Sequence, residues 1–293
     1  MLRILMLSFF ALLLAGCSNE VKDDFFAMDT YMTSVVYGTQ EDSDAVKSEI
    51  YRLDSLLRWD KIDVSQSEVS ELIIEAEELK AFTGGAFDIS VSPILELWGF
   101  RDKKFRVPYD SEILEALSLE NTSVDFGGIG KGYAGKKVRE LLLSRGVTSA
   151  IVSLGGNVQT VGSKPDGKPW RVGIQNPDGE GYVGYTDVSD LSVITSGGYH
   201  RYFEADGKKY SHIINPETGY PADTDIKSVT VVSQDGTAAD ALSTAFYVLG
   251  THKTKELCEK ENYLYNNVPF GVIIIDAENE IHCIGDINFE RKD

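Results

Sequence analysis

Residues 124–157 read VDFGGIGKGYAGKKVRELLLSRGVTSAIVSLGGN, and this stretch contains the change of pattern that decides the fold. A short strand ends in a glycine-rich turn, and the turn opens a helix predicted over Gly132–Arg145, with Gly146 as its stop signal. The β-rich run Ala150–Leu154 follows. Helical patterns dominate before this point and strand patterns after it, which predicts an α+β fold.

The flanking sequence extends this pattern in both directions. Before the stretch, the sequence predicts a strand at Met32–Tyr37, an amphipathic helix over Ser43–Trp59, a second helix from Ser65 (with Glu68 at capping-box spacing) to Gly84-Gly85, and a third over Asp110–Leu119. After it, the predicted strands are Trp170–Gln175, Val183–Val188, Val193–Thr195 and Ile226–Val232, with hairpins at Arg201–Ile214 and Gly271–Ile284. The predicted late helices are Ala238–Leu249 and Lys253–Glu261. No repeat or linker follows residue 24, so residues 25–293 are predicted to form one domain of mixed sheets and helices.

The composition is that of a folded globular protein. Of the 293 residues, 42% are hydrophobic and 25% are charged. Lys and Arg number 28 against 46 Asp and Glu, which gives a net charge of −18. This charge repels nucleic-acid phosphates and therefore excludes a basic DNA- or RNA-binding module.

The first residues have the pattern of an export signal. Arg3 precedes an apolar run, Ile4–Leu14, that is too short for a comfortable membrane span, and Leu14–Cys17 resembles a bacterial lipobox. We therefore expect residues 1–16 to be a signal peptide, Cys17 to be lipidated and residues 17–24 to be a polar tether. An ordinary signal peptide with a chance cysteine is the alternative. The domain would then be exported and lipid-anchored to a bacterial membrane, outside the cytoplasm.

The glycine-rich turn is a candidate phosphate site. Its free backbone N–H groups and the helix dipole point at one spot. Gly130, Gly132 and Gly135 have dinucleotide-fold spacing, but the next strand ends in Gly155-Gly156-Asn157, without the acidic residue that contacts a ribose. The turn is not a P-loop, because Lys131 is followed by glycine. The alternative is a tight turn that needs glycine for its backbone alone.

A second candidate is the pair Asp240 and Thr244. Four residues apart on a predicted helix, they place a carboxylate and a hydroxyl on one face. Such oxygens suit Mg²⁺, which takes few protein ligands. The alternative is that Thr237 and Asp240 form a capping box.

A histidine and a serine complete the candidates. His212 lies among small polar residues before a Pro/Gly turn and could act as an acid, a base or a phosphate donor, or serve only the structure. Ser196 reads as a binding hydroxyl, because the chain lacks the Gly-x-Ser-x-Gly elbow of hydrolases. Cys258 and Cys283 could pair or be small buried hydrophobes, and the sequence leaves both options open.

Taken in order, these motifs resemble those of the ApbE family, the FAD:protein FMN transferases. The resemblance covers about residues 26–285. It rests on Met28–Tyr31, Thr83–Asp88 with Pro93 and Leu97–Phe100, Asp125–Tyr133, Leu154–Asn157, Trp170–Ile174, Thr195–Gly197, His212–Gly219 and Asp240–Thr244.

The resemblance implies a T-fold-like catalytic domain and a reaction. Such enzymes bind FAD with Mg²⁺, cleave its pyrophosphate, and attach FMN through a phosphodiester bond to a threonine or serine of a partner protein, releasing AMP. The partner implied is an exported electron-transfer subunit. Two alternatives are an FAD pyrophosphatase giving FMN and AMP, and a non-catalytic FAD-binding lipoprotein.

The resemblance also implies roles for residues. Mg²⁺ would be held by Asp240, Thr244 and the backbone carbonyl of Gly130. His212 is the favoured base, Asp240 the alternative, and Lys131 adds positive potential. The FAD site would comprise Met28, Ala86, Phe87, Asp88, Trp98, Asp125, Gly127, Gly128, Lys131, Tyr133, Ser196, His212 and Ile213. The segment Lys61–Val64 after Asp60 is shorter than in relatives, so we expect the adenine-side contacts to differ.

Overall fold

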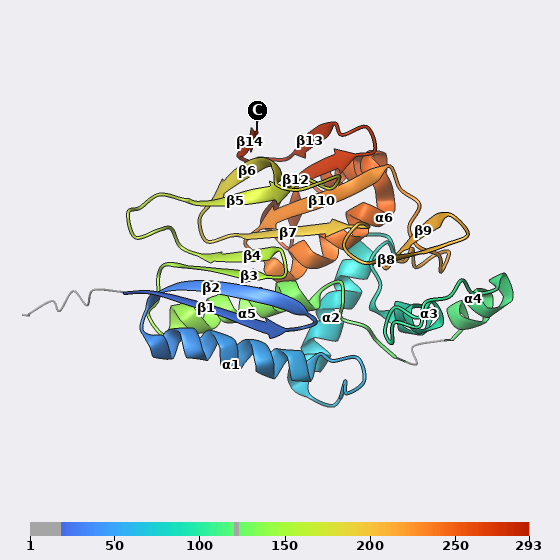
Figure 1. The fold of residues 1–293 in the computed structure, drawn as a ribbon, viewed down its shortest axis with the longest axis horizontal. Coiled ribbons are helices and arrows are strands. Elements are labelled where there is room, and N and C mark those ends of the chain that lie inside the picture. Colours follow the sequence, from blue (N-terminus) through green and yellow to red (C-terminus); the bar gives the residue numbers. More distant parts are fainter. Residues whose placement is uncertain (1–18, 120–122, 293) are drawn as a thin grey trace, which may run out of the picture.

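A nine-stranded antiparallel sheet forms the centre of the protein (Figure 1). The computed structural model describes residues 19–119 and 123–292, so the predicted signal peptide and Cys17 lie outside the described residues. In spatial order the strands are β1 (Asn19–Ala27), β2 (Thr30–Gly38), β3 (Ala150–Leu154), β4 (Asn157–Val161), β7 (Ser192–Gly197), β10 (Ile226–Ser233), β12 (Val268–Asp276) and β11 (Leu264–Tyr265), with β13 (Ile281–Ile284) also paired to β12.

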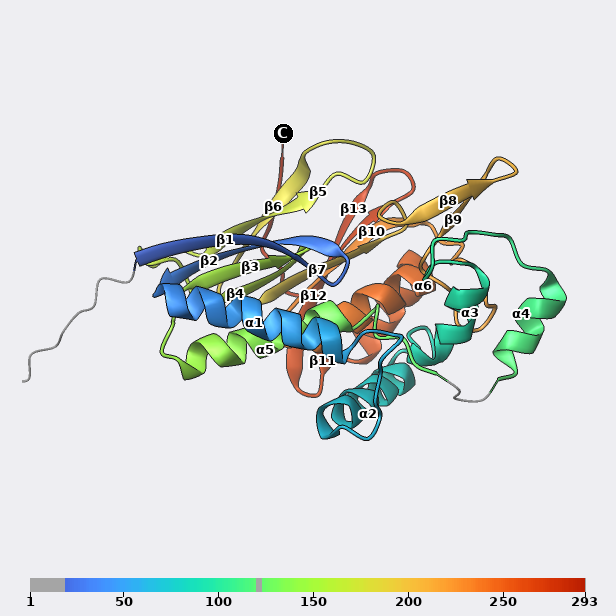
Figure 2. The same ribbon diagram turned by 60° about the horizontal axis from the view of Figure 1, so that its bottom comes forward.

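Three helices cover one face of this sheet. Figure 2 shows α1 (Gln40–Leu56), α5 (Gly130–Ser144) and α6 (Gly236–Lys260) on the same side, and α2 (Ser67–Phe82) beyond them. Their apolar residues form the main core with the sheet. The capping box of α1 consists of Thr39 and Asp42, so this helix begins three residues before its predicted start.

The opposite face carries a smaller sheet, made of β5 (Trp170–Gln175), β6 (Tyr182–Val188) and β14 (Phe289–Arg291). Strand β12 is therefore buried on both sides. Its Val272 and Ile274 belong to the main core, while Ile273 and Ile275 belong to the core beneath the small sheet. This double burial explains the unbroken apolar run in that strand.

A third cluster lies at one end of the molecule. It joins the short helices α3 (Ser92–Leu97) and α4 (Asp110–Leu117), which follow the turn η1 (Ile89–Val91), to the hairpin β8 (Tyr202–Ala205) and β9 (Lys208–Ser211). Trp98 is fully buried at its centre, against Phe203, Tyr210 and Tyr220.

The predicted α+β class and single domain agree with this architecture, and several details are corrected. Residues 19–24 are not a tether: they belong to β1, which pairs with β2 along its whole length. The alternation of apolar and polar residues expected of a strand is hard to see in the β1 sequence. Charged Asp23 takes an inward position, and apolar Phe26 is 63% exposed. Helix α2 has Gln66 as its N-cap without a side-chain cap, so the capping box predicted from Ser65 and Glu68 is absent there.

The structure also shows the C-terminal helices and the two cysteines of the domain. Helix α6 contains a break at Gly250, with φ 79° and ψ 170°, between the two helices predicted from sequence. Cys258 is buried in α6 and Cys283 is exposed in β13, and both thiols are free. No helix within residues 19–119 and 123–292 is long and apolar enough to cross a membrane.

Candidate active site

A cavity of about 550 Å³ opens at the ends of the central strands. Segments far apart in the chain contribute to its wall, among them the β1–β2 turn, the glycine-rich turn before α5, the start of α6, the chain after β7 and the chain after β9. A volume of this size is typical of small-molecule sites. The sequence brings these segments together because strand ends and helix starts meet at one edge of the sheet.

Asp240 lies in the wall of this cavity and is only 3% exposed. Its Oδ2 accepts the backbone N–H of Gly132 at 2.8 Å, and its Oδ1 accepts the Asn157 Nδ2–H at 3.1 Å. The N-cap of α6 is Asp235, whose carboxylate accepts the N–H groups of Thr237 and Ala238. Asp240 is therefore not a capping residue, and the capping-box alternative for it is wrong.

Thr244 lies one turn after Asp240 and also faces the cavity. The Ser196 hydroxyl lies 3.4 Å from the Thr244 hydroxyl and 2.8 Å from that of Ser243. A Cβ atom at Gly128 would lie 3.2 Å from the Thr244 Oγ1. The glycine-rich turn therefore passes close to Thr244, and a side chain there would crowd this hydroxyl.

The donor set fits a hard divalent cation. Asp240, Thr244 and Gly130 all line this cavity, and they offer a carboxylate, a hydroxyl and a backbone carbonyl as donors. Among the described residues, no group of three or more His, Cys, Asp and Glu side chains could hold a metal ion. A site with one carboxylate matches Mg²⁺, which usually keeps waters and phosphate oxygens as its remaining ligands.

The chain around the β8–β9 hairpin supplies basic groups. His212, His200, Arg201 and Lys131 all line the cavity. Burial lowers the pKa of His212 to about 3, and the positive charges of Arg201 and Lys131 contribute to this low value. Burial also lowers the pKa of His200. The His212 imidazole is therefore neutral near pH 7.

The tautomer of His212 follows from its hydrogen bond. Its Nδ1 lies 3.0 Å from the Arg201 backbone carbonyl oxygen. A carbonyl oxygen only accepts, so in the neutral ring Nδ1 carries the proton. The Nε2 atom then has a free lone pair and can accept a proton.

Contacts of Arg101 hold together another part of the cavity wall. Arg101 donates to Asp125 at 3.0 Å and to Ser92 at 2.6 Å, and its guanidinium lies 4.8 Å from the centre of the Trp59 ring. Asp125 also accepts the N–H of Gly127 at 2.8 Å. Trp59 lines the cavity, so the short connection after α1 still supplies part of the wall.

This geometry agrees with the comparisons to known proteins. The pattern of the ApbE family matches residues 28–265. The chain belongs to the ApbE family. Within it, the chain is 35% identical to the FAD:protein FMN transferase of Escherichia coli K12, over 76% of this chain and 72% of that protein. It is 31% identical to the enzyme of that name from Vibrio cholerae O395, over 90% and 91%.

Solved structures of ApbE proteins share the fold. The ApbE protein of Thermotoga maritima superposes with a TM-score of 0.81 and 30% identity, covering 90% of this chain and 96% of that one. The apo flavinyl transferase ApbE of Pseudomonas stutzeri gives a TM-score of 0.77 and 27% identity, covering 92% and 95%. The α+β class predicted from the sequence is therefore confirmed.

Most of the residues that the ApbE resemblance assigned to the site line one cavity. These are Met28, Ala86, Phe87, Asp88, Asp125, Gly127, Gly128, Gly130, Lys131, Ser196, His212, Ile213, Asp240 and Thr244. Asp88 has structural partners as well, because it pairs with Lys80 at 2.8 Å and caps the turn η1.

Two assigned residues lie elsewhere and are corrections. The Trp98 indole is buried in the third cluster and donates to the Gly219 carbonyl oxygen at 2.9 Å, so it does not line the cavity. The Tyr133 hydroxyl donates to Glu68 at 2.9 Å, on the side of α5 that faces α2, and it does not line the cavity either. Both rings serve packing.

Sequence reasoning missed other residues of this ApbE site. His200, Arg201 and Arg101 line the cavity, and Asn157 orients Asp240. Asn157 belongs to the Leu154–Asn157 motif, and its position directly after two glycines was the available signal. His200 and Arg201 directly follow the Ser196–Tyr199 segment, where basic residues beside a predicted binding turn would have been the signal.

Proposed function

We propose that this protein is a Mg²⁺-dependent FAD:protein FMN transferase. In the reaction, a threonine or serine oxygen of a partner protein bonds to the FMN phosphorus of FAD. The pyrophosphate P–O bond breaks, AMP leaves, and the hydroxyl proton passes to a base. The observation that carries the proposal is one cavity that holds Asp240 and Thr244 beside the glycine-rich turn, with a neutral His212 in the same wall.

His212 is the base that the contacts favour. Its Nδ1–H donates to the Arg201 carbonyl, which fixes the ring and leaves Nε2 able to accept the hydroxyl proton. Asp240 is the weaker candidate, because it would be a ligand of the metal ion and its oxygens also accept hydrogen bonds. The N–H groups of Gly130 and Gly132 already donate to the Phe126 carbonyl and to Asp240, so the phosphates would be bound by Lys131 and Arg201.

Asp240, Thr244 and the Gly130 carbonyl would hold Mg²⁺. When bound there, the ion would neutralise charge on the pyrophosphate as its bond breaks. Ser196, within 3.4 Å of the Thr244 hydroxyl, would keep that hydroxyl oriented. Met28, Ala86, Phe87 and the Trp59–Arg101 pair would form the remaining wall around FAD.

We also propose that the enzyme acts outside the cytoplasm, held at a bacterial membrane by a lipid on Cys17. The positive start, the apolar run and the lipobox-like Leu14–Cys17 support this. Its partner would then be an exported electron-transfer subunit. Metabolic labelling with a radioactive fatty acid tests the anchor, since Cys17→Ala should abolish the label.

The activity is tested with FAD, Mg²⁺ and a peptide that carries an Asp-Gly…Ala-Thr type motif. We expect the peptide to gain the mass of FMN on its threonine, seen by mass spectrometry, with one AMP released per label. FMN and AMP without labelled peptide would instead indicate a pyrophosphatase. FAD that stays bound and intact would indicate a storage protein and would overturn the proposal.

A further inference from the structure

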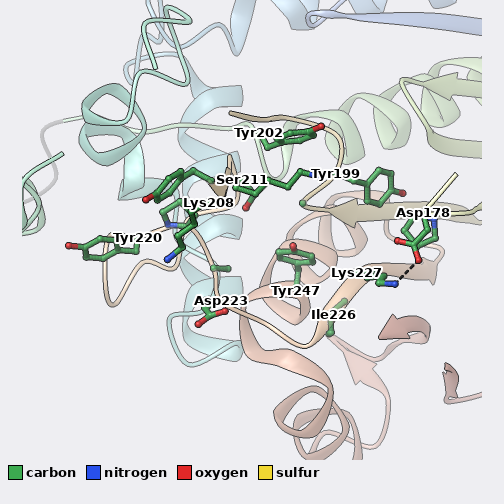
Figure 3. Close-up of a pocket in the computed structure, with 16 residues that line it drawn as sticks. Asp178, Tyr199, Tyr202, Lys208, Ser211, Tyr220, Asp223, Ile226, Lys227 and Tyr247 are labelled. Carbon is green, nitrogen blue, oxygen red and sulfur yellow. Dashed lines mark hydrogen bonds and ion pairs between the residues drawn. The ribbon is translucent and has the colours of Figure 1, made fainter. Parts of the chain in front are cut away.

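A second cavity, of about 320 Å³, lies against the β8–β9 hairpin (Figure 3). We call it the tyrosine pocket, because its lining includes Tyr199, Tyr202, Tyr210, Tyr220 and Tyr247. Tyr247 reaches it from α6, and the Tyr220 hydroxyl donates to Asp110 at the start of α4. The pocket is therefore built on the β8–β9 hairpin together with α6 and the segment around Tyr220, which is tied to α4.

The wall between this pocket and the active-site cavity is a single backbone. Gly198 and Tyr199 line the tyrosine pocket, while the next residues, His200 and Arg201, line the active-site cavity. Likewise, Ser211 faces the tyrosine pocket and His212 faces the active site. A molecule in the tyrosine pocket would thus lie one residue away from the base.

Two hydroxyl groups of the pocket have no partner. The Tyr199 phenol oxygen and the Ser211 Oγ are buried, and neither has a hydrogen-bond partner among the described residues. Buried hydroxyl groups usually have a partner in folded proteins, so an orphan calls for an explanation. An extended polypeptide offers the N–H and C=O groups that would satisfy both.

The pocket is basic although the chain carries a net charge of −18. Lys208 and Lys209 line it and form no ion pair with any residue in the described ranges. Their ammonium groups lie over Tyr210 and Tyr202, at 5.6 and 4.2 Å from the ring centres. Lys227 is neutralised by Asp178 at 2.5 Å, and Asp223 is the other carboxylate of the lining. Lys208 and Lys209 are neighbours in β9 and therefore point to opposite faces of the hairpin, where Lys209 lies across from Glu204 and Lys208 lies across from Ala205. Lys208 has no carboxylate opposite it, so it favours an acidic ligand.

We propose that the tyrosine pocket binds the acceptor polypeptide beside its flavin-receiving hydroxyl, with an acidic side chain of that segment against Lys208. The inference rests on the proposed transferase function, because only a protein acceptor needs a second site next to His212. Flat tyrosine faces suit packing against an extended main chain, and the two orphan hydroxyls suit its peptide groups.

The test uses two synthetic peptides, one with a threonine and a neighbouring aspartate and one with asparagine in place of the aspartate. The full chain is compared with the double variant Lys208→Glu/Lys209→Glu. The control, Lys103→Glu/Lys253→Glu, makes the same charge change at two exposed lysines outside both cavities. Transfer rates give KM for each peptide, and fluorescence titration gives Kd for FAD.

We expect the double variant Lys208→Glu/Lys209→Glu to raise KM for the aspartate peptide at least tenfold. Its KM for the asparagine peptide should stay within threefold of the native value. Kd for FAD should be unchanged, and the control should behave as the native chain. Equal KM changes for both peptides, or in the control, would overturn the acidic contact. A changed Kd for FAD would make the pocket part of the FAD site and overturn the proposal.

The orphan hydroxyls give a second readout. Tyr199→Phe and Ser211→Ala remove buried groups without partners, so thermal stability should not fall, while KM for the peptide should rise. Unchanged KM in both variants would overturn peptide binding here. If the native chain labels neither peptide but cleaves FAD, the transferase function itself fails, and this inference falls with it.

Discussion

The Oδ2 atom of Asp240 in α6 accepts the backbone N–H of Gly132 in α5 at 2.8 Å. The N–H groups in the first turn of a helix have no partner within that helix, so the carboxylate satisfies one of them. The contact ties the proposed Mg²⁺ ligand to the proposed phosphate turn. It requires the two helix starts to touch, and Gly132 allows this.

Gly132→Ala should therefore destabilise the fold and reduce activity together. A Cβ atom there would collide with the Gly236 carbonyl oxygen and lie 2.6 Å from the Asp240 Cβ. Overpacking of this kind costs about 1–3 kcal/mol in unfolding free energy. Gly130→Ala is the stability control, because its Cβ would meet Leu57 at an ordinary 3.6 Å. Equal urea midpoints for the two variants would contradict this account.

Asp240→Asn should remove metal binding and also lower the unfolding free energy by about 1–3 kcal/mol, because one buried donor loses its acceptor. The amide nitrogen would face a donor, either the Gly132 N–H or the Asn157 amide, and the negative charge would be lost. We expect kcat to fall about a hundredfold or more, the range for lost electrostatic stabilisation. Mn²⁺ binding, followed by electron paramagnetic resonance, should weaken in parallel.

The matched control for this substitution is Asp235→Asn in the same helix. Asp235 caps α6 outside the cavity, and asparagine is an equally good N-cap. Its Mn²⁺ affinity and kcat should stay near those of the native chain. A native-like Mn²⁺ affinity in Asp240→Asn would exclude Asp240 as a ligand.

The parts of this site that the sequence predicts are those fixed by local geometry. Asp240 and Thr244 share a helix face because they are four residues apart, and tertiary packing cannot change that. Trp98 and Tyr133 belong to the same set of motifs, yet their rings point into packing contacts that depend on distant residues such as Gly219 and Glu68. Spacing along the chain carries no signal for such contacts.

The same limit explains the residues that were missed. Arg101 is held at the cavity by contacts with distant residues, among them Asp125, which lies 24 residues away. In the sequence, His200 and Arg201 look like ordinary charged residues of the surface. They line the cavity because the chain turns toward it after β7. The strand β1 pairs along its length with β2, yet its charged inward residue gives it the composition of a linker.

Trp98→Phe should lower stability without changing FAD affinity. The substitution leaves the Gly219 carbonyl without its indole donor and leaves a gap beside Phe203 and Tyr210. Loss of a buried hydrogen bond costs about 1–3 kcal/mol. Urea unfolding and FAD titration separate the two effects.

Trp59→Phe should instead change FAD affinity and leave stability unchanged. This ring is 47% exposed and lines the cavity, so FAD affinity should change while the unfolding free energy stays within about 0.5 kcal/mol. A loss of FAD affinity in Trp98→Phe at native stability would return Trp98 to the site.

His212 determines the last prediction, which concerns pH. Burial, with Arg201 and Lys131 nearby, lowers its pKa to about 3, whereas an unfolded histidine titrates near 6.5. Between these values the unfolded chain binds a proton that the folded chain does not. Stability should therefore be full above pH 6.5 and fall as the pH drops toward 3, by at most about 1.4 kcal/mol per pH unit.

His212→Gln should abolish that slope and also the transfer reaction. Removal of a general base lowers kcat by about 10²–10⁴-fold, and no pH between 5 and 8 should restore it, because the glutamine amide does not accept a proton in this range. His252→Gln, at a side chain that is 86% exposed on α6, supplies the baseline slope. Urea unfolding at pH 7, 5 and 4 measures all three proteins. If the native chain and His212→Gln lose stability in parallel between pH 7 and 4, the imidazole is not buried in its neutral form, and its assignment as a preformed base is wrong.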